Sequence, residues 1–330
     1  MGLSLSRERL VELLDRGRRA RILVVGDAML DVYLAGDVDR ISPEAPVPVV
    51  RVRERRYALG GAANVAQNVT AVGASCRLVA AIGRDGAGEV LSRMLATIGA
   101  GETLLHVERC TTQKSRVLAR SQQLVRIDEE DDDPLGDAEI ERLLALIRDA
   151  VATADAVVLE DYNKGLLVPE VIRATIDAAT ERALPIVVDP KYRNFFSFAG
   201  ATIFKPNRRE LESAVGATID LDDPSALPGL LEHLGTRHLL LTLGERGMLL
   251  ASADGALERI MAVAREVYDV VGAGDTVTAY LATMLAAGAT PAEAAVIANV
   301  AAGIEVGKLG AASVSRDELL DYVDAHALHV

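Results

Sequence analysis

The stretch DVVGAGDTV, Asp269 to Val277, places two glycines and a carboxylate between an apolar run and a helix-like segment. The glycines around Ala273, Gly272 and Gly274, could let successive backbone N–H groups converge on an anion at a helix N-terminus. Asp275 could accept a proton beside that anion. Together the two roles describe phosphoryl transfer to a hydroxyl group. The plainer interpretation is a tight turn in which Asp275 only stabilises the helix start, and short glycine motifs are weakly specific.

Two further groups combine small and polar residues near predicted strand ends. Asp27 and Asp31 in GDAMLD follow the first apolar run, where carboxylates could bind sugar hydroxyls or simply cap a turn. Gly60, Gly61 and Asn64 begin the stretch GGAANVAQN. Small residues there could let a ligand approach the backbone while the amide of Asn64 donates and accepts. Close packing of a helix on a sheet is the alternative for these glycines.

The stretch NRRE, Asn207 to Glu210, follows the strand-like run ATIFKP. Asn with Glu three residues later is typical of a capping box, so the pair could serve only to start a helix. The same two side chains could instead support Mg²⁺ through water beside nucleotide phosphates.

These groups need a scaffold that brings strand ends together. Short apolar runs such as RILVVGD, DAVVLED and PIVVDP indicate strands that are buried on both faces. Helix-like segments lie between many of these runs, over 62–72, 86–98, 137–152, 169–182 and 208–215. The alternation predicts an α/β fold in which helices flank a mostly parallel central sheet. Ligands on such a sheet bind beyond the carboxyl ends of the strands, where all four groups are expected.

Two regions interrupt this alternation. The segments at about 33–58 and 112–131 are strand-like and have no helical crossover of their own, so they predict a small β-sheet that projects as a lid or, more plainly, as an exposed hairpin. A helix is expected over about 6–20. The acidic run Asp128 to Asp133 is interpreted as a solvated loop rather than a metal site.

Composition excludes several classes of protein. The 330 residues carry a formal net charge of −13, which argues against a general nucleic-acid or anionic-membrane binder. Two cysteines, Cys76 and Cys110, are too few for a disulfide framework or a zinc site and favour a reducing cytoplasm. The N-terminus lacks the apolar core of a signal peptide, and the Ala-rich region 276–306 is broken by proline and glutamate, as in buried soluble helices.

The stretches GGAANVA and DVVGAGDT resemble the two signatures of the PfkB (ribokinase-like) carbohydrate kinases, in the same order and about two hundred residues apart. NRRE matches the Asn-x-x-Glu that this family associates with magnesium. The resemblance runs from about Arg21 to Ser315. It implies an ATP-dependent sugar kinase with the ribokinase-like α/β fold, a single domain over 1–330 and a small β-sheet lid.

The resemblance also implies a role for each group of residues. Asp275 would take the hydroxyl proton, and the amides of Gly272, Ala273 and Gly274 would stabilise the transferring phosphoryl group. The sugar would be oriented by Asp31, Gly60, Gly61 and Asn64, with Asp27 as a further candidate. ATP would lie near the turn with Thr242, Gly244 and Gly247 and near Asn299, and its Mg²⁺ would be supported indirectly by Asn207 and Glu210. A monovalent cation is left open.

A narrower resemblance points to a substrate. RISPEAPVPVV, VDPK and GIEVGKLGAASV are similar to the D-glycero-β-D-manno-heptose-7-phosphate kinases, including the kinase half of ADP-heptose synthases. The implied product is the 1,7-bisphosphate, for lipopolysaccharide precursor synthesis. The substrate phosphate needs its own donors, and Arg116, Arg120, Lys164 and Lys191 are candidates that could equally be surface charges. EDYNKG and IFKPN depart from many relatives, which leaves the sugar open.

The family also sets expectations about partners. The chain ends near the point where the bifunctional proteins begin their nucleotidyltransferase half, so we expect a stand-alone cytoplasmic kinase, forming a homodimer through the lid and binding neither nucleic acid nor membrane. Two alternatives stay open: a ribokinase-like kinase for another substrate (a fructose-type sugar, ribose or 2-keto-3-deoxygluconate), and a catalytically silent sugar- or nucleotide-binding regulator. A dinucleotide-dependent oxidoreductase is disfavoured, because GDAMLD rather than G-x-G-x-x-G follows the first strand.

Overall fold

A large twisted sheet forms the body of the molecule. The computed structural model describes residues 5–101, 103–119, 122–221, 227–263, 268–308 and 310–326. Within these residues, nine strands form one sheet in the order β13-β12-β11-β10-β9-β8-β1-β4-β5. Neighbours from β11 to β5 pair in parallel, and β12 and β13 extend the sheet in antiparallel fashion. The strands are β1 (Arg21–Gly26), β4 (Ser75–Gly83), β5 (Leu104–Val107), β8 (Ala156–Glu160), β9 (Ile186–Asp189), β10 (Ile203–Phe204), β11 (His238–Thr242), β12 (Met248–Ser252) and β13 (Leu257–Ile260).

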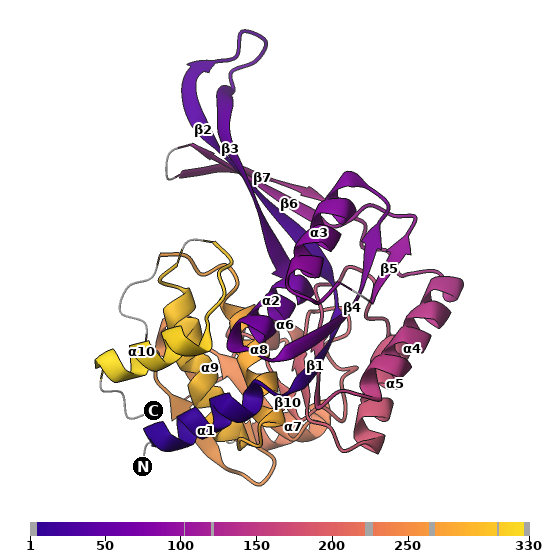
Figure 1. The fold of residues 1–330 in the computed structure, drawn as a ribbon, viewed down its shortest axis with the longest axis vertical. Helices are drawn as coiled ribbons and strands as arrows, with labels where there is room; N and C mark the ends of the chain where they lie inside the picture. The colour runs from indigo at the N-terminus through magenta and orange to yellow at the C-terminus, as the bar shows by residue number, and fades with distance from the viewer. Residues whose placement is uncertain are drawn as a thin grey trace.

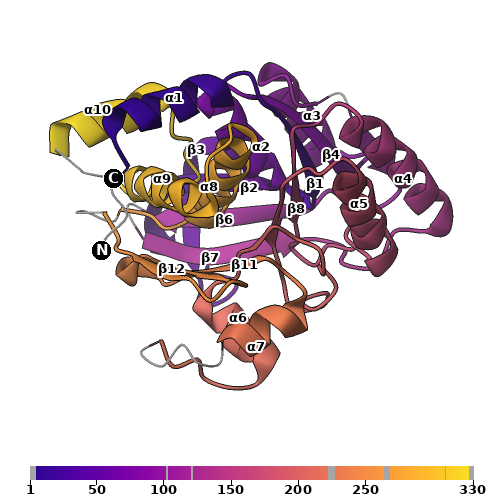
Figure 2. The same ribbon diagram turned by 90° about the horizontal axis from the view of Figure 1, so that it is seen from below.

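Helices cover both faces of this sheet. Side chains alternate along each strand, so Ile22 and Val24 of β1 face one helical layer while Leu23 and Val25 face the other. The first layer holds α1 (Arg7–Gly17), α2 (Ala62–Val72), α3 (Gly86–Thr97), α8 (Ala273–Ala286), α9 (Pro291–Glu305) and α10 (Arg316–His326). The second holds α4 (Asp137–Val151), α5 (Pro169–Glu181), α6 (Arg208–Val215) and α7 (Leu227–Leu234) (Figure 2). The predicted α/β fold is confirmed.

Several helices begin where the sequence offers a capping side chain. Ser6 accepts a hydrogen bond from the N–H of Arg9 at the start of α1, and Asp85 does the same for Gly88 in α3. Thr290 and Glu293 form a capping box at α9, where Pro291 takes the first position. In the described part of the chain, helices fall short of the length and apolar character that crossing a membrane requires.

A second, smaller sheet projects from the body as the lid (Figure 1). In the described residues it has four strands in the order β3-β2-β6-β7, namely β2 (Ala28–Ile41), β3 (Pro48–Gly61), β6 (Gln113–Ala119) and β7 (Gln122–Glu129). β2 and β3 reach further into the body than the expected segment 33–58. Their inner ends are buried and therefore show no polar alternation in the sequence. The β2–β3 hairpin consequently begins two residues after the end of β1 and leads directly into α2.

Candidate active site

The first turn of α8 contains the glycine motif. Gly272 precedes the helix with a φ of 98°, a conformation that glycine adopts readily and other residues avoid. A Cβ atom at this position would lie 2.9 Å from Nδ2 of Asn64 and 3.1 Å from Oε1 of Glu305. Glycine is therefore required both by the backbone and by the close approach of two side chains. The turn presents the positive end of α8, which favours an anion.

Asp275 lies in this turn and is only 4% exposed. Its Oδ2 accepts a hydrogen bond of 2.7 Å from Asn64, and its Oδ1 accepts one of 2.8 Å from the hydroxyl of Tyr162. Burial raises the pKa of Asp275 to about 6, although the two hydrogen bonds oppose the shift. The carboxylate is thus ionised at neutral pH while staying basic enough to accept a proton.

Asn64 is itself held in place from α2. The amide of Asn68, one turn later, donates to the backbone oxygen of Asn64 at 3.1 Å and to its Oδ1 at 3.3 Å. Asn68 Oδ1 in turn accepts a hydrogen bond from the hydroxyl of Thr276 in α8. This chain of buried amides ties α2 to α8 and fixes the side chain that orients Asp275.

A charged cluster lies behind Asp275, at the ends of the adjacent strands β8, β9 and β10. Oxygens of Glu160, Asp189 and Asp275 all lie within 4.8 Å of one another. The ammonium group of Lys205 donates to Oδ2 of Asp189 at 2.8 Å. Burial raises the pKa of Glu160 well above its usual range, and the nearby carboxylates add to the shift. Sequence reasoning assigned no role to Glu160, Asp189, Lys205 or Tyr162, because each is a single polar residue at a strand end.

A cavity of about 740 Å³ lies beyond the ends of β9, β10 and β11, and it is large enough for a nucleotide. Its lining includes five of the predicted residues, Lys191, Asn207, Glu210, Thr242 and Gly244. The other lining residues are Tyr192, Arg208, Arg209, Ser213 and Leu243.

Two residues expected on the nucleotide side are not among those that line this cavity. Gly247 has a φ of 80° and closes the turn between β11 and β12, where a Cβ atom would lie 2.0 Å from the backbone oxygen of Ile260. Asn299 lies in α9, and its amide donates to the backbone oxygen of Met261 at 2.8 Å. The turn glycine and this helix-to-loop contact account for both residues structurally.

The Asn-x-x-Glu pair forms the capping box that its spacing permits. Asn207 Oδ1 accepts the N–H of Glu210 at 2.9 Å, and Glu210 Oε2 accepts the N–H of Asn207 at 2.8 Å. Lys191 donates to Oε1 of Glu210 at 2.6 Å. Both carboxylate oxygens thus already accept hydrogen bonds, yet the pair lines the cavity with oxygen donors of the kind Mg²⁺ prefers. This donor set fits a magnesium ion held through water better than one bound directly.

The predicted sugar side brings Asp31, Gly60 and Arg116 together. Arg116 Nη1 donates to Asp31 Oδ1 at 2.5 Å, and a Cβ atom on Gly60 would lie 2.8 Å from Asp31 Oδ2. Asp27 instead locks the turn after β8, because its Oδ2 accepts the backbone N–H groups of Tyr162 and Lys164 at 2.8 and 3.0 Å. The carboxylate of Asp31 therefore pairs with Arg116 of the lid, whereas that of Asp27 binds backbone N–H groups.

One row of the lid sheet is strongly basic. Strand register places Arg56, Tyr33, Arg116 and Arg126 side by side across β3, β2, β6 and β7. The guanidinium groups of Arg56 and Arg116 each lie 5.3 Å from the centre of the Tyr33 ring, as in cation–π pairs. Arg56 and Arg126 were missed from the sequence, because their neighbours become visible only through the pairing of the strands.

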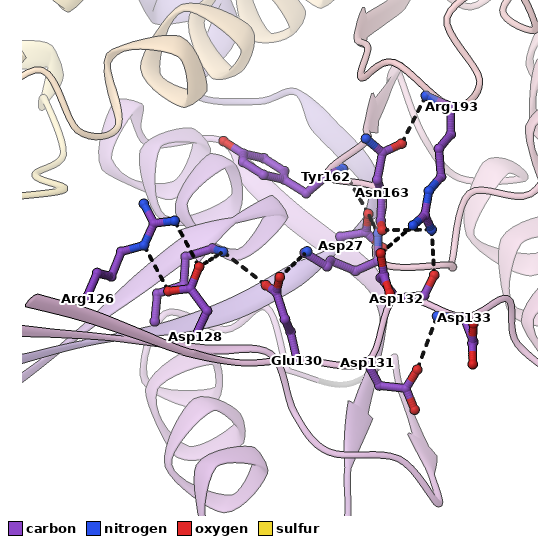
Figure 3. Close-up of polar contacts among 12 residues, drawn as sticks. Asp27, Arg126, Asp128, Glu130, Asp131, Asp132, Asp133, Tyr162, Asn163 and Arg193 are labelled. Atoms are coloured by element: carbon purple, nitrogen blue, oxygen red, sulfur yellow. Dashed lines mark hydrogen bonds and ion pairs between the residues drawn. The ribbon is translucent and has the colours of Figure 1, made fainter.

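The sequence predicts a loop for the acidic run Asp128 to Asp133, but its first two residues form the end of β7. The run is mostly exposed and linked by ion pairs (Figure 3). Lys114 lies 3.3 Å from Asp128 and 3.1 Å from Glu130, and Lys164 lies 2.9 Å from Glu130. The predicted cation Lys164 is therefore neutralised by the lid. Asp128 also pairs with Arg126, and Asp132 with Arg193. Arg120, another predicted cation, lies outside the described residues.

The two sheets and their flanking helices form a ribokinase-like α/β fold. Ribokinase from Arabidopsis thaliana, solved with ribose and ATP, superimposes with a TM-score of 0.72 at 21% identity, covering 92% of this chain and 98% of that chain. Phosphofructokinase-2 from Escherichia coli, solved with potassium, gives a TM-score of 0.76 at 20% identity, with coverages of 92% and 99%. At these identities the likeness shows the fold.

Residues 19–318 match the model of the pfkB family of carbohydrate kinases, and the chain belongs to this family. Among curated relatives, the bifunctional protein HldE of Rhodospirillum rubrum is 44% identical over 315 residues, which are 94% of this chain and 64% of that protein. The bifunctional protein HldE of Caulobacter vibrioides is 46% identical over 303 residues, 90% of this chain and 62% of that protein. The chain thus spans somewhat less than two thirds of the length of these relatives.

Proposed function

We propose that this chain transfers the γ-phosphoryl group of ATP to the anomeric hydroxyl of D-glycero-β-D-manno-heptose 7-phosphate and so forms the 1,7-bisphosphate. The observation that carries the proposal is the position of Asp275, whose carboxylate lies in the first turn of α8 with a pKa raised to about 6. A base and an anion-binding turn thereby share one place, which is what phosphoryl transfer to a hydroxyl requires.

In this mechanism Asp275 takes the proton of the sugar hydroxyl as the new P–O bond forms and the bond to ADP breaks. Asn64 and Tyr162 keep the carboxylate oriented through hydrogen bonds of 2.7 and 2.8 Å. Backbone amides of Gly272, Ala273 and Gly274 stabilise charge on the transferring group. Donors that are already fixed in place need no reorganisation as charge develops.

ATP would occupy the cavity beside β9, with its phosphates directed toward α8. Lys191, Thr242 and Gly244 all line that cavity. Mg²⁺, when bound, would neutralise charge on the phosphates of ATP, and Asn207 and Glu210 would hold it through water. The requirement for a monovalent cation stays a prediction, and no residues are assigned to bind it.

The heptose phosphate is supported by the narrower sequence resemblance and by the relatives named HldE. The basic row of the lid adds a physical reason. Arg116 lies beside Asp31, and Arg56 and Arg126 flank it on the same face of the sheet. Asp31 would accept hydrogen bonds from sugar hydroxyls while the arginines bind the substrate phosphate, because guanidinium groups match phosphate geometry.

A substrate panel tests the proposal. ADP release is measured with heptose 7-phosphate, fructose phosphates, ribose and 2-keto-3-deoxygluconate, each at several concentrations. The expected result is the highest kcat/KM with heptose 7-phosphate. A preference for another sugar would reassign the substrate within the family, and no turnover with any of them would favour a silent binding protein.

We also propose that the lid forms a homodimer contact in a cytoplasmic enzyme whose single kinase domain is the whole chain, 1–330. Alternation along the strands puts exposed apolar side chains on the lid face opposite Arg116, namely Val38, Val52, Tyr57, Val125 and Ile127. Light scattering after size-exclusion chromatography should give twice the chain mass. Ile127→Glu should shift the protein to the monomer, whereas Arg53→Glu, also on the lid, should not; an unchanged mass for Ile127→Glu would reject the lid contact.

A further inference from the structure

Lys205 is an unusual residue for its position. It follows β10 and is 3% exposed, and its ammonium group lies 2.8 Å from Oδ2 of Asp189. A Cβ atom built on Gly274 would lie 3.7 Å from Nζ of Lys205. Cβ atoms of a helix tilt toward its N-terminus, so the ammonium group lies on the N-terminal side of α8. It therefore borders the turn that would hold a phosphoryl group.

A buried cation at this end of a helix needs compensation, because the helix terminus is itself positive. Asp189 supplies part of it, and burial, which would lower the pKa of Lys205, is outweighed by attraction to Asp189. An ammonium group carries three N–H donors. Among the described residues Lys205 donates one hydrogen bond, to Asp189. The other two N–H donors have no hydrogen-bond partner among these residues, although the side chain is almost completely shielded from solvent.

Glu160, the last residue of β8, supports this arrangement. It is fully buried, and neither of its oxygens accepts a hydrogen bond from the described residues. Such a group is most stable as a neutral acid that donates to Asp189, whose own pKa is kept low by Lys205 and Lys191 in spite of burial. Asp189 then keeps its full negative charge and holds the ammonium group of Lys205 in place.

We propose that Lys205 is a further catalytic residue, whose ammonium group contacts the γ-phosphoryl oxygens of ATP during transfer while Asp189 and Glu160 hold it from behind. The inference rests on the proposed kinase function. The bonds made and broken are those already given: the hydroxyl proton goes to Asp275, the sugar oxygen bonds to phosphorus, and ADP leaves. Lys205 keeps its proton throughout and acts by charge and hydrogen bonding.

The three carboxylates would otherwise invite a metal ion, since their oxygens lie within 4.8 Å of one another. Lys205 already places a positive charge against Asp189, and both oxygens of Asp275 are engaged by Asn64 and Tyr162. The fixed ammonium group of Lys205 thus takes the place that a metal ion would have in this cluster.

The test compares Lys205→Met and Lys205→Arg with the wild type and with Arg173→Met, a control that removes an exposed basic side chain paired with Asp177 on α5. For Lys205→Met, kcat should fall on the order of 10²- to 10³-fold, as when one donor to a transition state is removed. The dissociation constant of ATP should change only a few fold. Lys205→Arg should recover part of kcat, and Arg173→Met should match the wild type.

A second readout separates catalysis from structure. Dissociation constants are measured for ADP alone and for ADP with aluminium fluoride, both in the presence of the sugar phosphate. Because the fluoride complex mimics the transferring group, Lys205→Met should weaken its binding by at least tenfold more than it weakens the binding of ADP alone. Equal losses for both ligands, or a kcat within threefold of the wild type, would overturn the role of Lys205.

Loss of Lys205 also leaves the charge of Asp189 buried without its partner, and the variant could unfold for that reason. The double variant Lys205→Met/Asp189→Asn removes both charges and should restore the melting temperature without restoring discrimination between ADP–aluminium fluoride and ADP. Recovery of that discrimination in the double variant would contradict the proposal. A wild type that turns over none of the sugars would refute the kinase function first, whereas an active wild type with an active Lys205→Met would refute only this inference.

Discussion

The two sides of the candidate site are built in opposite ways. Around the start of α8, Asp275, Asn64 and Lys205 are almost completely buried, and each is held by a short hydrogen bond, Asn64 to Asp275 and Lys205 to Asp189. On the lid, the ion pairs of Arg126 and Lys114 lie near solvent, and some side chains have more than one partner. Fixed, dry dipoles suit a reaction in which charge develops at a known place. Ion pairs near solvent are weak and exchange easily. They therefore suit the capture of an anionic substrate, because its phosphate can replace the acidic residues that pair with the lid cations.

This contrast predicts the largest loss for Asp275→Asn. The amide cannot accept the hydroxyl proton, so kcat should fall by about 10²- to 10⁴-fold while ATP binding survives. Single-turnover rates and equilibrium binding of ATP measure the two effects. Asp177→Asn, an exposed acid on α5, serves as the control. A kcat within a few fold of the wild type would remove Asp275 from the role of base.

The next effect comes from the backbone that faces Asp275. Gly272→Ala forces a side chain into a φ of 98° and against Asn64, which should displace the base and lower kcat by roughly 10²-fold. Gly255→Ala is a matched control, because Gly255 has a φ of 90° but open space around its Cβ position. Both variants carry a similar backbone strain. If they lose the same activity, the contact with Asn64 is irrelevant to catalysis.

On the lid side the expected loss is in substrate capture. Arg116→Ala should raise the KM for the sugar phosphate by about tenfold with little change in kcat, because a charged hydrogen-bond donor is removed. Raising the salt concentration should change the difference little, because the side chain of Arg116 is only 12% exposed and buried charges are weakly screened. Arg53→Ala removes a comparable lid arginine that pairs with Asp37, and its KM should stay normal. A fall in kcat alone would place Arg116 with the buried side instead.

The smallest expected effect is on the pH dependence of kcat/KM. Below its pKa of about 6, Asp275 is protonated and cannot act as a base, so kcat/KM should fall about tenfold for each pH unit on the acid side. Above that value the carboxylate is ionised and the profile should level off. The residual activity of Asp275→Asn should lack this acid limb. An acid limb that persists in Asp275→Asn would assign the titration to another group.

Much of the fold could be predicted from the sequence, because its signals are local. The buried apolar runs indicated the parallel strands, and helix starts such as Asp137 and Pro169 fell where the structure has them. The glycine motif and the capping box at Asn207 could also be recognised, since their residues are neighbours in the chain. The site roles assigned to them stay predictions.

Other parts of the site could not be predicted in this way. Glu160, Asp189 and Lys205 end three different strands, and only the order β8-β9-β10 brings their side chains together. In the sequence each is one polar residue after an apolar run. Arg56 and Arg126 join Arg116 through strand register, which depends on a bulge between Ala35 and Gly36 and another after Val117. Such contacts arise from tertiary pairing rather than from local pattern.

The roots of the lid hairpin have a mechanical consequence. β2 leaves the body immediately after Asp27, and β3 returns at Gly61, whose neighbour Ala62 donates its N–H to the backbone oxygen of Asp27 at 3.0 Å. The base of the hairpin is thus closed by a backbone hydrogen bond, and Asp31 and Asn64 lie within a few residues of it. A displacement at the far end of β2 and β3 would therefore be transmitted along the backbone to Asp31 and Asn64, the residues proposed to orient the sugar.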